Sequence, residues 1–159
     1  MGKKSTKENK NIYFQSRENA GLTRAQASER IGCISESKIE KIENGTTPPQ
    51  PEDVVLMAEA YKNPRLCNYY CSHECRIGQE YVPEVEIKGL PEIALGLLSS
   101  LNALDKCKER LIEITEDGEI TSDEYADFKK IQDQLEKISV TVESLKMWVR
   151  DNEVGRERG

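Results

Sequence analysis

Short apolar clusters alternate with helix-capping residues in the first half of the chain, and this pattern predicts a series of short helices. Thr23 and Ser35 are N-cap residues, and Gly32 is placed to end the helix that Thr23 begins. The helix after Ser35 carries Ile39 and Ile42 on one face and charged residues on the others. Two short helices joined by a glycine-containing turn form a helix-turn-helix, whose second helix is suited to a DNA major groove.

Further helices are expected on both sides of this motif. The segment from Ile12 to Ala20 should form the preceding helix, which Gly21 would end. After a proline-rich stretch, the segment from Pro51 to Tyr61 has acidic residues in its first turn and an apolar face. A short fifth helix is expected from Arg65 to Cys71. The apolar and aromatic side chains of these segments should form a core.

The second half of the chain contains two longer helical patterns. Residues 81–89 alternate apolar and polar but contain Pro83, so we expect an extended linker rather than a strand. The first long helix is expected from Leu90 to Thr115, and Thr121 and Glu124 have the spacing of a capping box for the second. Apolar residues of the second helix recur at steps of three and four, as in a coiled-coil seam: Phe128, Ile131, Leu135, Ile138, Val142, Leu145 and Val149.

These patterns predict an all-α protein in which a five-helix head is followed by a long antiparallel helical hairpin. Two helices cannot hide their apolar stripes fully, because Leu98, Val140 and Trp148 lie off the main seam. We therefore expect a homodimer through the C-terminal hairpin, and the alternative is a monomer whose tail packs on the head. The expected organisation is a disordered basic arm at 1–10, a helix-turn-helix domain at 11–75, a linker at 76–89, the hairpin at 90–152 and a frayed tail at 153–159.

The head also carries an ordered string of residues at specific spacing, which runs through Arg17-Glu18, Gly21-Leu22-Thr23, Ser28, Gly32, Ile39, Ile42-Glu43-Asn44-Gly45 and Pro49. This string resembles the lambda-repressor-like, Xre-type helix-turn-helix family over roughly residues 10 to 70. The resemblance implies a lambda-repressor-like head of five helices. Ala27 stands where the family usually has leucine, and the turn that ends at Ser35 is one residue longer than usual.

The resemblance implies binding of double-stranded DNA. Arg24 occupies a position that commonly touches phosphate at the start of the motif's first helix, and the exposed part of the second helix would face the groove. Glu40 and Lys62 are expected to be ordinary solvated side chains. The expected DNA-binding residues are Arg24, Glu36, Ser37, Lys38, Lys41, Asn44 and Thr46.

The formal net charge of −6 is unevenly distributed along the chain. The first 80 residues contain 12 Lys and Arg against 11 Asp and Glu, whereas the remaining 79 contain 11 against 18. Phosphate binding depends on local basic groups more than on total charge, so the head and its basic arm are compatible with DNA. The modest basic charge indicates that DNA binding requires dimerisation or a partner.

Three of the five cysteines and the single histidine form a cysteine cluster: Cys67, Cys71, His73 and Cys75. Thiolates and imidazole are ligands of zinc and iron–sulfur centres, so these four residues are candidate metal ligands. In one continuous helix Cys67 and Cys75 would lie about 12 Å apart along the axis, so a site requires the helix to end near Cys71. The alternative, without a cofactor, is that Cys67 and Cys71 are small buried residues one helical turn apart.

The leading functional hypothesis is a sequence-specific DNA-binding transcriptional regulator that acts as a dimer. The alternative is a protein-interaction module or antitoxin-like partner that binds DNA weakly. The sequence argues against an enzyme, because it offers neither a Ser-His-Asp set nor a glycine-rich phosphate loop. The polar start lacks a signal-peptide core, and no stretch approaches the roughly 20 apolar residues of a membrane span, so we expect a cytoplasmic protein that binds no membrane.

Overall fold

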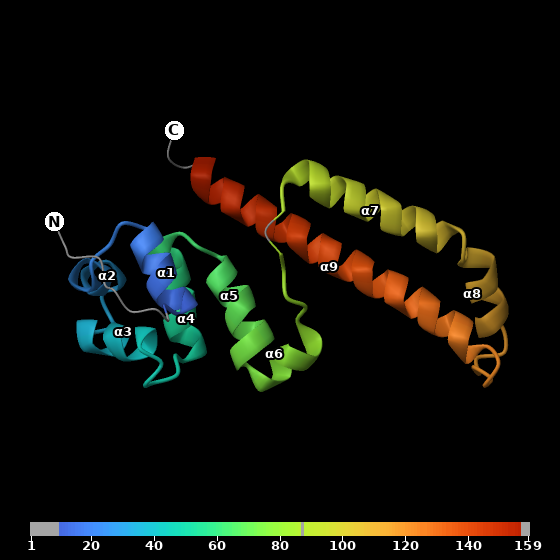
Figure 1. The fold of residues 1–159 in the computed structure, drawn as a ribbon, viewed down its shortest axis with the longest axis horizontal. Helices are drawn as coiled ribbons and strands as arrows, with labels where there is room; N and C mark the ends of the chain where they lie inside the picture. The colour runs from blue at the N-terminus through green and yellow to red at the C-terminus, as the bar shows by residue number, and fades with distance from the viewer. Residues whose placement is uncertain (1–9, 87, 157–159) are drawn as a thin grey trace. The chain divides into compact units, whose positions relative to one another are not determined.

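The computed structural model describes residues 10–86 and 88–156, and every regular element in these two ranges is helical (Figure 1). The predicted all-α fold, with a five-helix head followed by an antiparallel hairpin, is therefore confirmed. The chain divides into two compact units, the first formed by Met1–Val82 with Arg150–Gly159 and the second by Pro83–Val149. Apart from Lys10, the predicted basic arm lies outside the described residues, as do positions 157–159 of the predicted tail.

The head begins with the helices that the sequence predicts: α1 (Ile12–Asn19), α2 (Arg24–Ile31), α3 (Glu36–Glu43), α4 (Pro51–Tyr61) and α5 (Arg65–Tyr69). Local capping determines where α2 and α3 start. The Thr23 side chain accepts the Gln26 amide at 3.2 Å while the Gln26 side chain accepts the Thr23 amide at 2.9 Å, which completes a capping box. Ser35 accepts the Lys38 amide at 3.2 Å, and Gly32 ends α2 with a φ of 81°.

A continuous apolar core joins α1 to α5 and orients α3. Ile39 and Ile42 of α3 are at most 1% exposed, and they belong to one cluster with Met57 and Leu66. Each such side chain stabilises the fold by about 1.5–3 kcal/mol relative to an exposed position. Ala27 is fully buried in the same cluster, so the alanine at the family's usual leucine position is a core residue. Because one face of α3 packs into this core, the opposite face is exposed to solvent.

A π-helical segment, η1 (Tyr70–Glu74), continues α5 and leads into α6 (Arg76–Tyr81), where the sequence analysis placed the start of a linker. A side chain at Gly78 would collide with the Cys71 carbonyl, so glycine permits α6 to pack on η1. Tyr13 of α1 is buried, packs edge-on against Tyr69 with ring centroids 6.4 Å apart, and donates its hydroxyl to Glu74 at 3.1 Å. Burial and the Glu74 carboxylate raise the pKa of the Tyr13 phenol.

The second unit is the helical hairpin, formed by α7 (Leu90–Asp105), α8 (Lys108–Thr115) and α9 (Tyr125–Arg156), whose last turns belong to the first unit. The prediction of one helix from Leu90 to Thr115 was wrong, because the helix breaks at Lys106–Cys107. The Cys107 amide bonds to the Leu104 carbonyl at 2.9 Å, which tightens the last turn of α7, and the apolar pattern pauses there.

Helix α9 runs antiparallel to α7 in the hairpin (Figure 1). Gly96 of α7 faces Thr141 of α9, and a Cβ at this position would meet Cγ2 of Thr141 at the ordinary contact distance of 3.9 Å. The Glu124 carboxylate accepts both the amide and the hydroxyl of Thr121, at 3.1 and 2.7 Å, but the Glu124 amide bonds to the Thr121 carbonyl at 3.2 Å instead of the hydroxyl, so only half of the predicted capping box is formed. The interior contains Ile93 of α7 and Ile131 of α9, each 2% exposed.

Candidate nucleic-acid interface

Helix α3 presents the side chains that the sequence analysis expected to face DNA. Glu36, Ser37 and Lys41 are exposed, whereas Lys38 is half-buried at the edge of the same face. The arrangement follows from the helical period, because Ile39 and Ile42 occupy the core and turn the intervening residues outward.

Glu43, at the last turn of α3, anchors the helix to α1 and α2. Its carboxylate accepts hydrogen bonds from Nε and Nη2 of Arg17, at 2.5 and 3.0 Å, and from Nε of Arg24 at 2.8 Å. Arg17 also donates to the Leu22 carbonyl at 2.7 Å, so its guanidinium is held on two sides. The Glu43 side chain is fully buried and that of Arg17 is 8% exposed. Charge-assisted, bidentate bonds of this kind fix the orientation of α3.

Arg24 therefore lies at the predicted interface but is already paired within the protein. Besides Glu43, it contacts Glu40 of α3, with Nη1 and Oε1 3.0 Å apart. Glu40, expected to be merely solvated, is in fact an ion-pair partner of Arg24. Because the Arg24–Glu40 pair is exposed, it contributes at most about 1 kcal/mol, and a DNA phosphate can replace Glu40 at little cost.

The two lysines of α3 differ in their surroundings. Lys38 Nζ lies 2.7 Å from Oδ1 of Asp53, whose other oxygen accepts the Gln50 amide at 2.9 Å at the start of α4. Lys41 is exposed and makes no ion pair with any residue in the described ranges 10–86 and 88–156. Of the two, Lys41 is thus the cation that a nucleic acid meets without breaking an existing pair.

The segment after α3 folds back on the end of the helix. Gly45 has a φ of 71°, and the amides of Thr46 and Thr47 both donate to the Lys41 carbonyl, at 2.9 and 3.3 Å. The Thr46 hydroxyl donates to the same carbonyl at 3.0 Å. These two amides and the Thr46 hydroxyl are therefore engaged, while the side chains of Asn44 and Thr46 lie at the exposed surface of the turn.

Residues 15–67 match the family model described as a helix-turn-helix domain. This part of the chain is similar to a helix-turn-helix domain. The match includes α2, α3 and α4 and is consistent with the lambda-repressor-like, Xre-type resemblance. Neither a curated protein nor a solved structure matches the chain. Within the described ranges, none of the helices combines the length and the apolar character that crossing a membrane requires.

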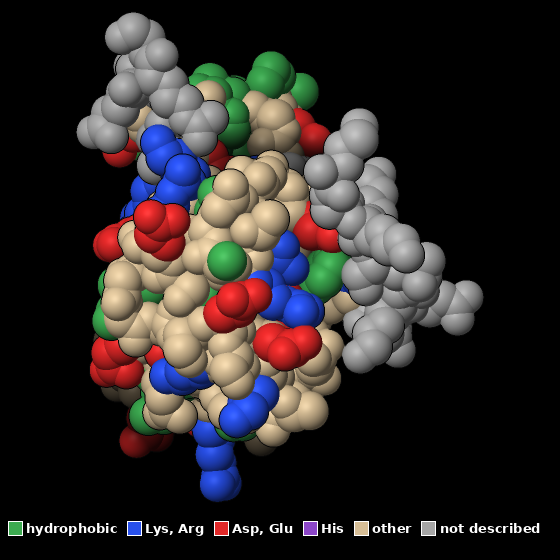
Figure 2. Space-filling view, turned by 90° about the vertical axis from the view of Figure 1, so that its left-hand side faces the viewer, with side chains coloured by type: hydrophobic (Ala, Val, Ile, Leu, Met, Phe, Trp, Pro, Cys, Tyr) green, Lys and Arg blue, Asp and Glu red, His purple; other side chains and the backbone are tan. Residues whose placement is uncertain are grey.

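The surface of the helix-turn-helix domain mixes both signs of charge. Figure 2 views the molecule from the side on which α2 and α3 lie in Figure 1, and blue and red side chains are interspersed on that face. This agrees with the pairing of Arg24 and Lys38 with carboxylates. Interspersed charges of opposite sign partly cancel, so this face lacks a strong positive field.

The cysteine cluster begins at Cys67, the last residue of the matched segment, and continues through η1 to the residue before α6. His73 stacks on Tyr69, with centroids 4.4 Å apart, and its Nδ1 lies 2.9 Å from the Ser72 hydroxyl. Across the described residues, no three His, Cys, Asp or Glu side chains gather in a group able to hold a metal ion, so the four candidate ligands do not converge. All the cysteines are free, and burial, with Cys71 nearby, raises the pKa of the Cys67 thiol.

Sequence reasoning predicted the exposed face of α3 but missed the interactions that hold this helix in place. Arg17 and Glu43 stood in the family string without a role, and Asp53 was noted only as an acid in the first turn of α4. All three are buried charged residues. The sequence did contain a signal for this pair: Arg17 and Glu43 lie at positions where the helical period predicts burial. Buried charges require partners, so the two could have been expected to pair.

Proposed function

We propose that this protein is a sequence-specific DNA-binding transcriptional regulator that binds as a homodimer. The observation that carries the proposal is the helix-turn-helix domain, with α3 buried on one face and exposing Glu36, Ser37 and Lys41 on the other. In such a domain the second helix of the motif enters the major groove and its exposed side chains meet base edges.

The chemistry of α3 suits both base and phosphate contacts. Lys41 can donate to guanine or to a phosphate, Glu36 can accept from the amino group of cytosine, and Ser37 can bond to several bases. Arg24 is held by the buried Glu43 through its Nε and can exchange its exposed partner, Glu40, for a phosphate. The Arg17–Glu43 pair keeps α3 fixed during this exchange, so recognition requires little rearrangement.

Dimerisation is supported by apolar side chains that the hairpin leaves in solvent. On α7, Leu95, Leu98 and Leu101 recur at steps of three and are 68%, 58% and 44% exposed. On α9, Leu135 and Val149 of the predicted seam are 47% and 39% exposed. A second copy would bury the same strips on both chains, because a two-fold interface pairs identical surfaces.

A dimer also compensates for the modest charge of one head. Two heads double the number of phosphate contacts, and each contact adds affinity through counterion release. A two-fold dimer places its two recognition helices on half-sites roughly 34 Å apart, one turn of the DNA, or on multiples of that spacing.

Selection from a pool of randomised duplexes tests this proposal. The purified full-length protein should enrich an inverted repeat, and a labelled duplex of that sequence should give a footprint on both half-sites. Enrichment of an isolated half-site would overturn the dimer but keep DNA recognition. A folded protein that enriches no sequence would overturn the regulator.

A second candidate function is a protein-interaction module with weak DNA binding, the antitoxin-like alternative. The pairing of Arg24 and Lys38 with carboxylates favours it, since these cations are partly neutralised before DNA arrives. The same selection separates the two, because an interaction module would leave the duplex pool unenriched.

A further inference from the structure

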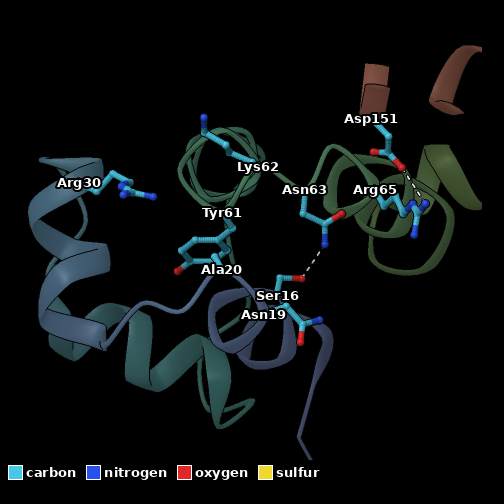
Figure 3. Close-up of a pocket in the computed structure, with 9 residues that line it drawn as sticks. All are labelled: Ser16, Asn19, Ala20, Arg30, Tyr61, Lys62, Asn63, Arg65 and Asp151. Atoms are coloured by element: carbon cyan, nitrogen blue, oxygen red, sulfur yellow. Dashed lines mark hydrogen bonds and ion pairs between the residues drawn. The ribbon is translucent and has the colours of Figure 1, made fainter. Parts of the chain in front are cut away.

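A pocket of about 430 Å³ lies on the head where the C-terminal ends of α1, α2 and α4 meet the start of α5 (Figure 3). Its volume falls in the range of small-molecule sites. Ser16 and Asn19 come from α1, Arg30 from α2, and Asn63 and Arg65 from the segment after α4. In the view of Figure 3, Arg30 lies on one side of Tyr61 and Arg65 on the other. None of the lining residues belongs to α3, so the pocket is separate from the recognition helix.

The lining of this pocket carries an excess of positive charge. Arg30, Lys62 and Arg65 contribute three cations, and Asp151 of the same compact unit contributes one carboxylate. Arg65 Nη2 and Asp151 Oδ2 are 2.7 Å apart, so these two charges are paired. Arg30 and Lys62 form no ion pair within the described part of the chain. Glu59 lines an adjoining hollow with both of them but forms no ion pair with either, so the two cations remain able to attract an anion to this concave surface.

Neutral donors and an oriented guanidinium complete the polar lining. Nδ2 of Asn63 donates to the Ser16 hydroxyl at 2.9 Å, which orders both side chains between the two arginines (Figure 3). Nη1 of Arg30 donates to the Ala60 carbonyl at 3.2 Å, which orients the guanidinium and leaves its other N–H groups available. A planar guanidinium matches carboxylate and phosphate oxygens in a two-pronged geometry.

The backbone conformation of Lys62 is a second, independent observation in favour of a role for the lysine side chain at this pocket. Lys62 ends α4 in the left-handed conformation, with φ of 54°, and it is the non-glycine residue with positive φ among those that the structure describes. Glycine is the residue favoured at such a helix end, because any Cβ adds strain. The chain instead keeps a lysine, which the sequence alone suggested was an ordinary surface residue, and it lies at the pocket. Backbone strain of this kind clusters at functional sites.

We propose that this pocket binds a small organic anion bearing carboxylate or phosphate groups, held by Arg30, Lys62 and Arg65. The ligand shares Arg65 with Asp151 or takes it from Asp151, and Asn63 and Asn19 offer amide donors. This inference goes beyond the proposed function, since it assigns the head a ligand site away from its DNA-binding face.

Titration of the isotope-labelled full-length protein tests the site without DNA. Succinate and inorganic phosphate are added separately, with sodium chloride at matched ionic strength as reference, and backbone amide shifts are followed by NMR. We expect a saturable change at Asn19, Arg30, Lys62 and Asn63 with one of the two anions, and the anion that saturates identifies the ligand class. Shifts that grow without saturation for both anions, or that sodium chloride reproduces, would overturn the proposal.

Lys62→Gly is the sharpest variant, because it removes a pocket cation while relieving the left-handed backbone, so the fold should be retained or gain stability. The affinity for the anion should fall at least about tenfold, equivalent to about 1.4 kcal/mol. Arg76→Gln is the matched control, since it removes an exposed cation of α6 outside the pocket. Equal affinities in the two variants would show that only net charge matters and would refute the site.

Discussion

Replacing Glu43 with glutamine should destabilise the head far more than the same change at Glu40, although both residues lie on α3 and both contact Arg24. Glu43 is fully buried and accepts three hydrogen bonds from Arg17 and Arg24, whereas the Glu40 side chain is 53% exposed and makes one contact at 3.0 Å. The Glu43→Gln change leaves the buried Arg17 without a counter-charge, which costs about 3–5 kcal/mol. Loss of an exposed pair costs about 0.2–1 kcal/mol.

Urea unfolding followed by circular dichroism measures the difference. With a slope of about 1–3 kcal/mol per molar urea, a loss of 3 kcal/mol lowers the unfolding midpoint by at least about 1 M. Glu40→Gln serves as the matched control and should lower the midpoint by a small fraction of that amount. Equal midpoints for the Glu43→Gln and Glu40→Gln variants would refute the view that the buried network holds the recognition helix.

Three further outcomes are expected. Lys41→Ala should weaken binding to the selected duplex by roughly 1–3 kcal/mol in fluorescence anisotropy if the lysine reads a base, or flatten the salt dependence if it meets phosphate; unchanged binding and salt slope would remove it from the interface. Leu98→Asp or Leu135→Asp should shift sedimentation from dimer toward monomer, because each places a charge on a strip that a second copy would bury; a wild-type protein that sediments as a monomer at micromolar concentration contradicts this. Elemental analysis of protein purified in reducing buffer should find no stoichiometric zinc or iron, since the side chains of the cysteine cluster do not converge; one bound metal per chain would restore the metal hypothesis.

Local signals were enough to predict α1 to α5 of the head, but not α6, which lies where a linker was expected. Thr23, Gly32 and Ser35 act through contacts with residues that are near in sequence, so capping chemistry alone places the ends of α2 and the start of α3. The apolar period likewise predicted the burial of Ile39 and Ile42, because the face of a helix follows from its geometry.

The partners of the charged residues could not be predicted in the same way. Arg24 meets Glu40 and Glu43, and Lys38 meets Asp53, only after α2, α3 and α4 pack together. Such pairs depend on the relative rotation of helices, which single-sequence patterns do not fix. The break between α7 and α8 has a similar origin, since neither proline nor glycine marks Lys106–Cys107 and the chain bends where apolar contacts lapse.

The hydrogen bond from Tyr13 to Glu74 shows that the folded head extends beyond the residues that match the family model. The matched segment ends at residue 67, yet the hydroxyl of a core tyrosine in α1 finds its acceptor in η1, and Gly78 of α6 fits against the carbonyl of Cys71. A fragment that keeps α1 but is cut after residue 67 would leave that buried hydroxyl without its partner, which costs about 1–3 kcal/mol. An excised head should therefore run at least through Val82, so that α6 remains, although it would still lack Asp151, which belongs to the same compact unit and pairs with Arg65.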